Sequence, residues 1–197
     1  MKPSDFYLGI SEFFSVLVPG FLVTIVFAFL FGEYDFNKDL SALTWVTLAV
    51  TSYVVGHILF AIGTKWDKFY DTHKPTGNER LLAKIRLLRN ALYSDNDTAD
   101  INNYQWCRST LLNCFPDAFM DVARKEADSK LFRSMIVPLM LLSIDMLISF
   151  QIMAMLLSAA LAYVAYSRYR TQRFKACKAA YTHVITLNTH GKINKPN

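Results

Sequence analysis

Two ionisable side chains lie inside apolar stretches of the sequence. His57 lies in the segment SYVVGHILFAIG, and Asp145 is the only charged residue between Ser134 and Tyr166. An ionisable group in a membrane-spanning helix must be neutralised, paired or close to water, and such residues commonly mark functional sites. The chemistry open to an imidazole and a carboxylate there is proton transfer, pore lining or gating.

Each of these residues also has a simpler interpretation. His57 can be a neutral imidazole that is hydrogen-bonded to a serine, a threonine or a carbonyl of a neighbouring helix. Asp145 can cap its helix or face the outer membrane interface. At ~1.5 Å rise per residue the two side chains differ in depth by roughly 8 to 10 Å. If they are functional, we expect them to be two separate polar positions along one pathway and not a catalytic pair.

The sequence contains no enzyme signature. His73, His183 and His190 form no metal-ligand spacing with the cysteines or carboxylates, and no HExxH, GxSxG, Walker or GxGxxG motif occurs. The three cysteines show no CxxC spacing and are expected to be reduced thiols on the cytoplasmic side. We therefore predict no catalytic residue, no metal and no cofactor.

The composition is typical of a membrane protein. The chain is 53% hydrophobic and 19% charged, against about 25% charged residues in soluble domains. Charge-free runs extend over Phe13–Phe31 and Ser41–Thr64. Asp5 and Glu12 precede the first run and a basic n-region is missing, so we expect no cleavable signal peptide.

The long apolar stretch Ser134–Tyr166 has two possible conformations. As one helix it would be roughly 50 Å long, whereas the hydrocarbon core is about 30 Å thick. It is therefore either one steeply tilted helix or two short helices that turn near Ser149, Phe150 and Gln151. Basic residues follow both Thr64 and Tyr166, and cytoplasmic segments are enriched in Lys and Arg. Two crossings place both basic regions inside, so the sequence favours the hairpin.

These patterns predict an all-α polytopic protein of the bacterial inner membrane, with four transmembrane helices and both termini in the cytoplasm. Residues 1–64 form an N-terminal transmembrane hairpin (spans about 13–31 and 43–63), and 65–131 a cytoplasmic helical insert. Residues 132–166 form a second transmembrane hairpin, and 167–197 a basic cytoplasmic helix and tail. In the insert we expect a helix capped by Asn78 or Thr76, and further helices over 101–113 and 117–132. The first carries an apolar stripe of Leu81, Ile85, Leu88 and Leu92.

Small and basic residues have separate expected roles. Pro19 and Gly20 in the first span, and Gly56 and Gly63 in the second, allow close helix packing, with a kink at Pro19 and no break. Basic residues next to the spans are expected to contact lipid headgroups or a partner, in preference to nucleic acid. They are Lys65, Lys68, Arg80, Arg86, Arg133, Arg168, Arg170 and Arg173.

Three segments carry a resemblance to a known group of proteins. They are the Pro19–Gly20 pair, YVVGH at 53–57 and ADSKLFRS at 127–134. In these segments the chain resembles small multi-pass inner-membrane accessory and effector proteins of bacterial antiphage loci, including CRISPR-associated ones. The resemblance implies an oligomeric membrane protein that perturbs the inner membrane when a cytosolic sensor or nuclease is engaged. It transfers no catalytic residue.

The functional prediction from the sequence is a non-enzymatic membrane effector or accessory subunit. It associates with copies of itself in the membrane lipid, forms a pore or gate, and receives a signal from a cytosolic partner. The first alternative is a passive anchor or scaffold for a soluble partner. The second is a small transporter-like protein, which would need ionisable residues at matching depth.

Overall fold

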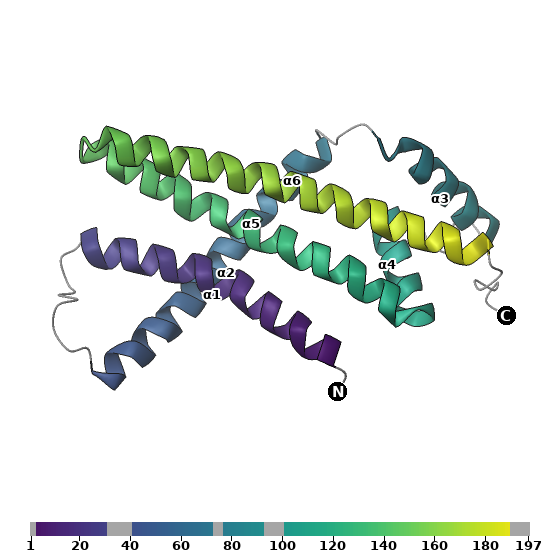
Figure 1. Ribbon diagram of the computed structural model, residues 1–197, viewed down its shortest axis with the longest axis horizontal. Helices are drawn as coiled ribbons and strands as arrows, with labels where there is room; N and C mark the ends of the chain where they lie inside the picture. Colours follow the sequence, from purple (N-terminus) through teal and green to yellow (C-terminus); the bar gives the residue numbers. More distant parts are fainter. Residues whose placement is uncertain (1–2, 31–40, 73–76, 93–100, 190–197) are drawn as a thin grey trace. The chain divides into compact units, whose positions relative to one another are not determined.

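A computed structural model describes residues 3–30, 41–72, 77–92 and 101–189, and this part of the chain is helical without strands (Figure 1). It contains helices α1 (Pro3–Leu30), α2 (Ala42–Thr72), α3 (Glu79–Leu92), α4 (Asn103–Cys114), α5 (Pro116–Ile148) and α6 (Ile152–Thr189). The all-α prediction is confirmed for the described residues. Residues 31–40, 73–76, 93–100 and 190–197 lie outside the described part of the chain.

Three of these helices are long and apolar enough to cross a membrane. The candidate spans lie in Ala42–Asp67 of α2, in α5 and in α6, and Phe13–Ala28 of α1 is a shorter apolar stretch. This agrees with the predicted membrane class. A span needs about 20 predominantly apolar residues, and both α5 and α6 reach their lengths by adding a polar part to an apolar one.

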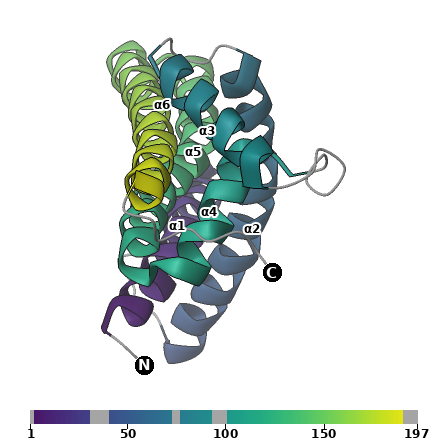
Figure 2. The same cartoon turned by 90° about the vertical axis from the view of Figure 1, so that its right-hand side faces the viewer.

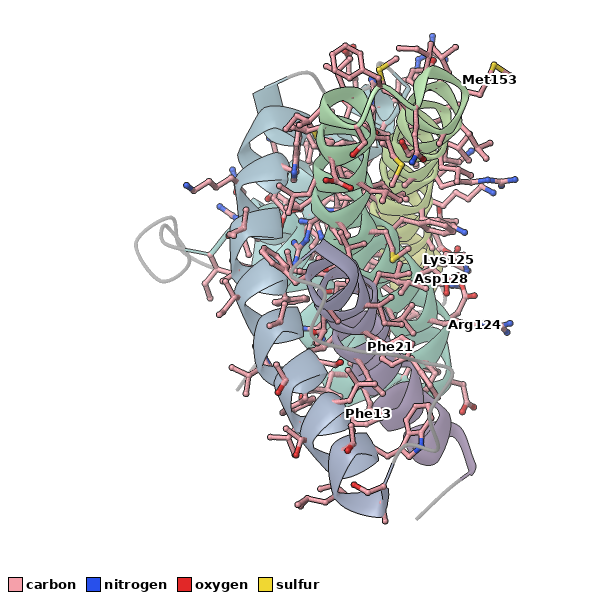
Figure 3. The ribbon with its side chains drawn as sticks, turned by 90° about the vertical axis from the view of Figure 1, so that its left-hand side faces the viewer. Phe13, Phe21, Arg124, Lys125, Asp128 and Met153 are labelled. Carbon is pink, nitrogen blue, oxygen red and sulfur yellow. The ribbon has the colours of Figure 1, made fainter. Side chains whose placement is uncertain are left out.

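The stretch Ser134–Tyr166 contains a turn at the predicted residues. α5 ends at Ile148 and α6 begins at Ile152, so the stretch forms two helices and not one tilted helix. Phe150 has a φ of 55°, in the left-handed region. The N–H of Gln151 donates to the Met146 carbonyl at 2.9 Å and that of Phe150 to Leu147 at 3.1 Å, which is the Schellman pattern of helix termination. The exposed Met153 side chain projects away from the helices at the start of α6 (Figure 3).

The chain divides into two compact units. The first comprises Met1–His73 and Ala127–Thr171, and the second Lys74–Glu126 and Gln172–Asn197. Helices α5 and α6 are unbroken through the positions near 131 and 166 where the composition changes. Lys and Arg are good helix formers, so a change from apolar to basic sequence does not end a helix. α2 likewise continues past Thr64 to Thr72, and α1 begins before Phe13, at Pro3.

In the first unit, α1 and α2 cross with their backbones in contact (Figure 1). A Cβ placed on Gly20 would lie 1.8 Å from the Ser52 carbonyl oxygen, and one on Gly56 would lie 2.1 Å from the Val16 carbonyl oxygen. Pro19 is buried beside the crossing and α1 continues through it unbroken. Close packing at Gly20 and Gly56, predicted from their size, agrees with these contacts. Figures 1 and 2 both show α5 and α6 side by side where they leave their turn.

The second unit has its own apolar core. The predicted stripe on α3 packs into it, with Ile85 fully buried and Leu81, Leu88 and Leu92 partly buried. α4 begins with a capping box, in which the Asn102 side chain accepts from the Gln105 N–H at 2.8 Å. Asn78 precedes α3, but its side-chain oxygen has no hydrogen bond to another described residue, and Thr76 lies outside the described part of the chain. The core is completed by Trp106, Cys107, Leu111, Val122, Ala180, Tyr181 and Val184.

Candidate functional site

A carboxylate on α2 joins three helices of the first unit. Arg133 of α5 donates from Nη1 to Asp67 Oδ2, and the Tyr169 hydroxyl of α6 donates to Asp67 Oδ1 at 2.7 Å. Arg133 is 5% exposed and Tyr169 is 1% exposed. We call these three residues the Asp67 cluster. It lies where the apolar parts of α2, α5 and α6 meet their polar parts.

The environment of Arg133 is largely apolar. Its guanidinium carbon lies 4.7 Å from the centroid of the Phe60 ring, within the range of a cation–π contact. Gly63 leaves room for its side chain, since a Cβ there would lie 3.5 Å from Arg133 Cγ. Arg133 Nε is buried and has no hydrogen-bond partner among the residues that the structure describes. Asp67 is therefore the group that compensates this buried charge.

The placement of Arg133 corrects one prediction. Arg133 was predicted to contact lipid headgroups or a partner, but its side chain is buried and paired with Asp67 within the chain. Asp67 was not predicted as a site residue from the sequence. It lies between Lys65 and Lys68, and the prediction for that segment rests on its basic residues. A signal is present in the sequence, since Asp67 is the first acidic residue after the apolar segment Ser41–Thr64 and Arg133 directly precedes the apolar segment Ser134–Tyr166.

His57 lines a pocket of about 370 Å³ in the first unit. Its ring packs edge-on against Tyr53, with centroids 4.6 Å apart. No hydrogen bond to His57 is found among the described residues, so the predicted bond to a neighbouring helix is not observed. The other basic residue at this pocket is Lys130 of α5. Its remaining lining residues are Phe13, Ser15, Val16 and Phe60, with Phe13 labelled in Figure 3.

Asp145 lies one turn before the end of α5 and is partly buried. Its backbone carbonyl accepts from the Ser149 N–H at 2.9 Å. Within the described part of the chain, no ion pair or contact joins its carboxylate to His57. The polar link between α5 and α6 at this end is instead the Ser143–Ser158 hydrogen bond of 2.9 Å. A polar pathway through His57 and Asp145 stays a prediction.

The other predicted contact residues divide by environment. Arg170 lies over the ring of Tyr166 at 5.8 Å, and Arg173 over Tyr104 at 5.3 Å. The side chain of Lys68 lies outside the described part. Exposed side chains, available for headgroups or a partner, are Lys65, Arg80, Arg86 and Arg168.

The residues of the Asp67 cluster include no metal-binding arrangement. Among the described residues, no group of His, Cys, Asp and Glu side chains is placed to hold a metal ion. No protein-family model, curated protein or solved structure matches this chain.

The second unit contains a separate polar cluster around Glu126. Glu126 accepts from the Tyr104 hydroxyl at 3.1 Å, and Arg108 Nε lies 3.2 Å from the same carboxylate oxygen. Burial, and then the charge of Glu126, raise the pKa of Tyr104 above its ordinary value. These contacts fix α4 against the polar part of α5, so the cluster stabilises the fold of this unit.

The thiol of Cys107 is expected to resist alkylation. It is fully buried, and burial raises its pKa to about 12, so at pH 8 almost none of it is the reactive thiolate. Cys114 is exposed. Maleimide labelling of the native protein, followed by mass spectrometry of peptides, should modify Cys114 well before Cys107. In denaturant both should react at similar rates, and rapid native labelling of Cys107 would contradict the buried core.

Proposed function

We propose that this protein is a non-enzymatic, multi-pass protein of the bacterial inner membrane that works as an oligomer. Four helices cross the membrane, both termini are cytoplasmic, and the helical unit outside the membrane receives a signal from a cytosolic partner. The response is the opening of a pore or gate. An antiphage setting follows from the resemblance of the segments at 19–20, 53–57 and 127–134.

The observation that carries this proposal is the exposed apolar surface of the long helices. In the apolar windows of α2, α5 and α6 only 28%, 22% and 22% of the residues are buried inside the chain. Val50, Val54 and Ile58 of α2 are each more than half exposed. Soluble monomers rarely carry apolar surface that extensive. Lipid, and other subunits embedded in it, are the surroundings that suit these faces.

The Asp67 cluster supports an even number of crossings. Asp67 ends the apolar part of α2, Arg133 precedes that of α5, and Tyr169 follows that of α6. Because the three side chains are in contact, these ends lie at one depth. The basic residues that follow the apolar parts of α2 and α6 then lie on one side of the membrane. We assign this side to the cytoplasm, because cytoplasmic segments are enriched in Lys and Arg. The apolar part of α1 supplies the remaining crossing.

The test is membrane permeability on induced expression in bacteria. We expect depolarisation and dye entry with the wild-type protein, and a several-fold reduction with His57→Phe and with Asp145→Asn. Ile58→Phe is the matched control, since Ile58 is an exposed neighbour of His57 on α2. If the wild-type protein leaves the potential and dye entry unchanged and purifies as a monomer, the pore is excluded.

One observation favours the anchor or scaffold as a second candidate. The second unit has its own buried core, drawn from α3, α4, α5 and α6, which suits a docking module for a soluble partner. Under this alternative, unrelated spans can replace the apolar segments without loss of function. Under the pore proposal, the same replacement abolishes the response while partner binding continues.

A further inference from the structure

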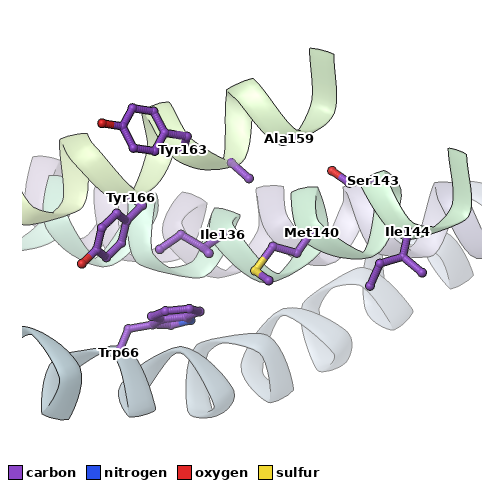
Figure 4. A pocket seen from close by; sticks show the side chains of 9 residues that line it. Trp66, Ile136, Met140, Ser143, Ile144, Ala159, Tyr163 and Tyr166 are labelled. Carbon is purple, nitrogen blue, oxygen red and sulfur yellow. The ribbon is translucent and has the colours of Figure 1, made fainter. Parts of the chain in front are cut away.

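An apolar groove of about 560 Å³ runs along the first unit between α2, α5 and α6 (Figure 4). Trp66 and Tyr166 lie at one end of the groove, Met140 in the middle and Ile144 at the other end. From Ile136 to Ile144 the α5 side is about 12 Å long at ~1.5 Å per residue. The groove is therefore elongated along the direction in which the helices cross the bilayer.

The two ends of the groove differ in charge. At the aromatic end, Arg170 lies over the ring of Tyr166 at 5.8 Å, and Lys65, next to Trp66 in the chain, is exposed. Towards the other end, neither α5 nor α6 has a basic residue between Ser134 and Tyr166. Trp and Tyr side chains favour the headgroup level of a bilayer. The groove is thus cationic and aromatic at one end and apolar along the rest.

We propose that this groove binds one anionic phospholipid, with an acyl chain along Ile136, Met140 and Ile144 and the phosphate beside Arg170. An anionic head joined to an apolar tail matches the polarity of the groove along its length. A second copy of the chain matches less well. In the same orientation it would bring its own Lys65 and Arg168 to the depth of Arg170, and like charges repel.

This site rests on the membrane location of the proposed function but not on a pore, an oligomer or a cytosolic partner. Trp66 provides a reporter at the groove, because bromine atoms on a lipid chain quench a tryptophan that they contact. The full-length protein is reconstituted in phosphatidylcholine vesicles. A minor fraction of the lipid is brominated-chain phosphatidylglycerol, or brominated-chain phosphatidylcholine at the same mole fraction.

We expect stronger quenching by brominated phosphatidylglycerol, and loss of this excess in Trp66→Phe. Arg170→Gln should lower the preference for phosphatidylglycerol by about five-fold, the factor for one interfacial cation. Arg168→Gln, an equal change of charge at an exposed residue outside the groove, should lower the preference reported by Trp66 clearly less than Arg170→Gln does. Ala159→Leu fills the groove and should remove the excess quenching, whereas Ala160→Leu, one residue away and outside the lining, should not.

Three results overturn the site. Equal quenching by both brominated lipids would show that the groove has no preference for an anionic headgroup. Equal effects of Arg168→Gln and Arg170→Gln would show that the preference comes from the basic surface in general and not from Arg170. If Ala159→Leu leaves the quenching unchanged but alters the size of cross-linked species, a second copy occupies the groove. Failure of the protein to float with vesicles refutes instead the membrane location. Unchanged permeability of the His57→Phe variant bears only on the pore.

Discussion

Gly56→Ala is expected to lower the free energy of unfolding of the first unit by about 3 kcal/mol, the upper end of the usual range for overpacking. The added Cβ would meet the Val16 carbonyl carbon at 2.8 Å and its oxygen at 2.1 Å. Both are backbone atoms of α1, so no side-chain rotation can relieve the overlap. The helices would have to separate along their whole crossing. Gly20→Ala should act in the same way from α1, where the added Cβ would meet the Ser52 carbonyl oxygen of α2.

Gly63→Ala is the matched control, because it makes the same chemical change in the same helix. Its Cβ would meet Arg133 at 3.5 Å, an ordinary van der Waals contact. Alanine also favours the helix over glycine by up to about 1 kcal/mol, so we expect Gly63→Ala to be neutral or stabilising. Unfolding of the purified protein in mixed micelles of increasing SDS content, followed by circular dichroism, measures both variants. Equal stabilities would contradict the close crossing.

This contrast shows what residue type alone could predict. Gly56 and Gly63 are equivalent in the sequence, each a small residue in an apolar span, and close packing was predicted for both. The structure separates them, since the neighbour of Gly56 is a backbone and that of Gly63 is a long side chain. Which helix lies against each face of α2 depends on tertiary packing. A sequence pattern does not contain that information.

The turn between α5 and α6 was predictable from physical length and charge. A helix through Ser134–Tyr166 is too long for a bilayer, and the basic segments that flank it favour two crossings. The left-handed conformation of Phe150 was not predictable, because this conformation usually takes Gly or Asn. Two backbone hydrogen bonds to Met146 and Leu147 compensate for the missing glycine.

The candidate site was harder to predict than the helices. His57 and Asp145 were selected because each is ionisable within an apolar run, which is a local property. The Asp67 cluster depends on contacts between residues that are far apart in the sequence, and Asp67 itself lies among lysines. The predicted domain bounds at 131 and 166 follow changes of composition, and α5 and α6 continue as helices through both positions.

The other large effect is expected from Asp67→Ala. It removes the carboxylate that pairs with Arg133 and accepts from Tyr169, and it leaves a cation that is 5% exposed without its counter-ion. Breaking one partner of a buried pair costs about 3 to 5 kcal/mol. Because the Asp67 side chain is itself 25% exposed, water can partly replace it, and we expect a loss near the lower value, about 3 kcal/mol.

Three further variants separate the charge from the packing. Tyr169→Phe removes only one hydrogen bond to a charged acceptor and should cost about 1.5 kcal/mol. The double variant Asp67→Leu with Arg133→Met removes both charges and should recover most of the stability, because a buried ion pair can be replaced by apolar side chains of similar volume. Lys65→Ala, at an exposed position on the same helix, should change little. SDS unfolding measures all four, and a double variant as unstable as Asp67→Ala would show that the Asp67 cluster contributes more than compensation of a buried charge.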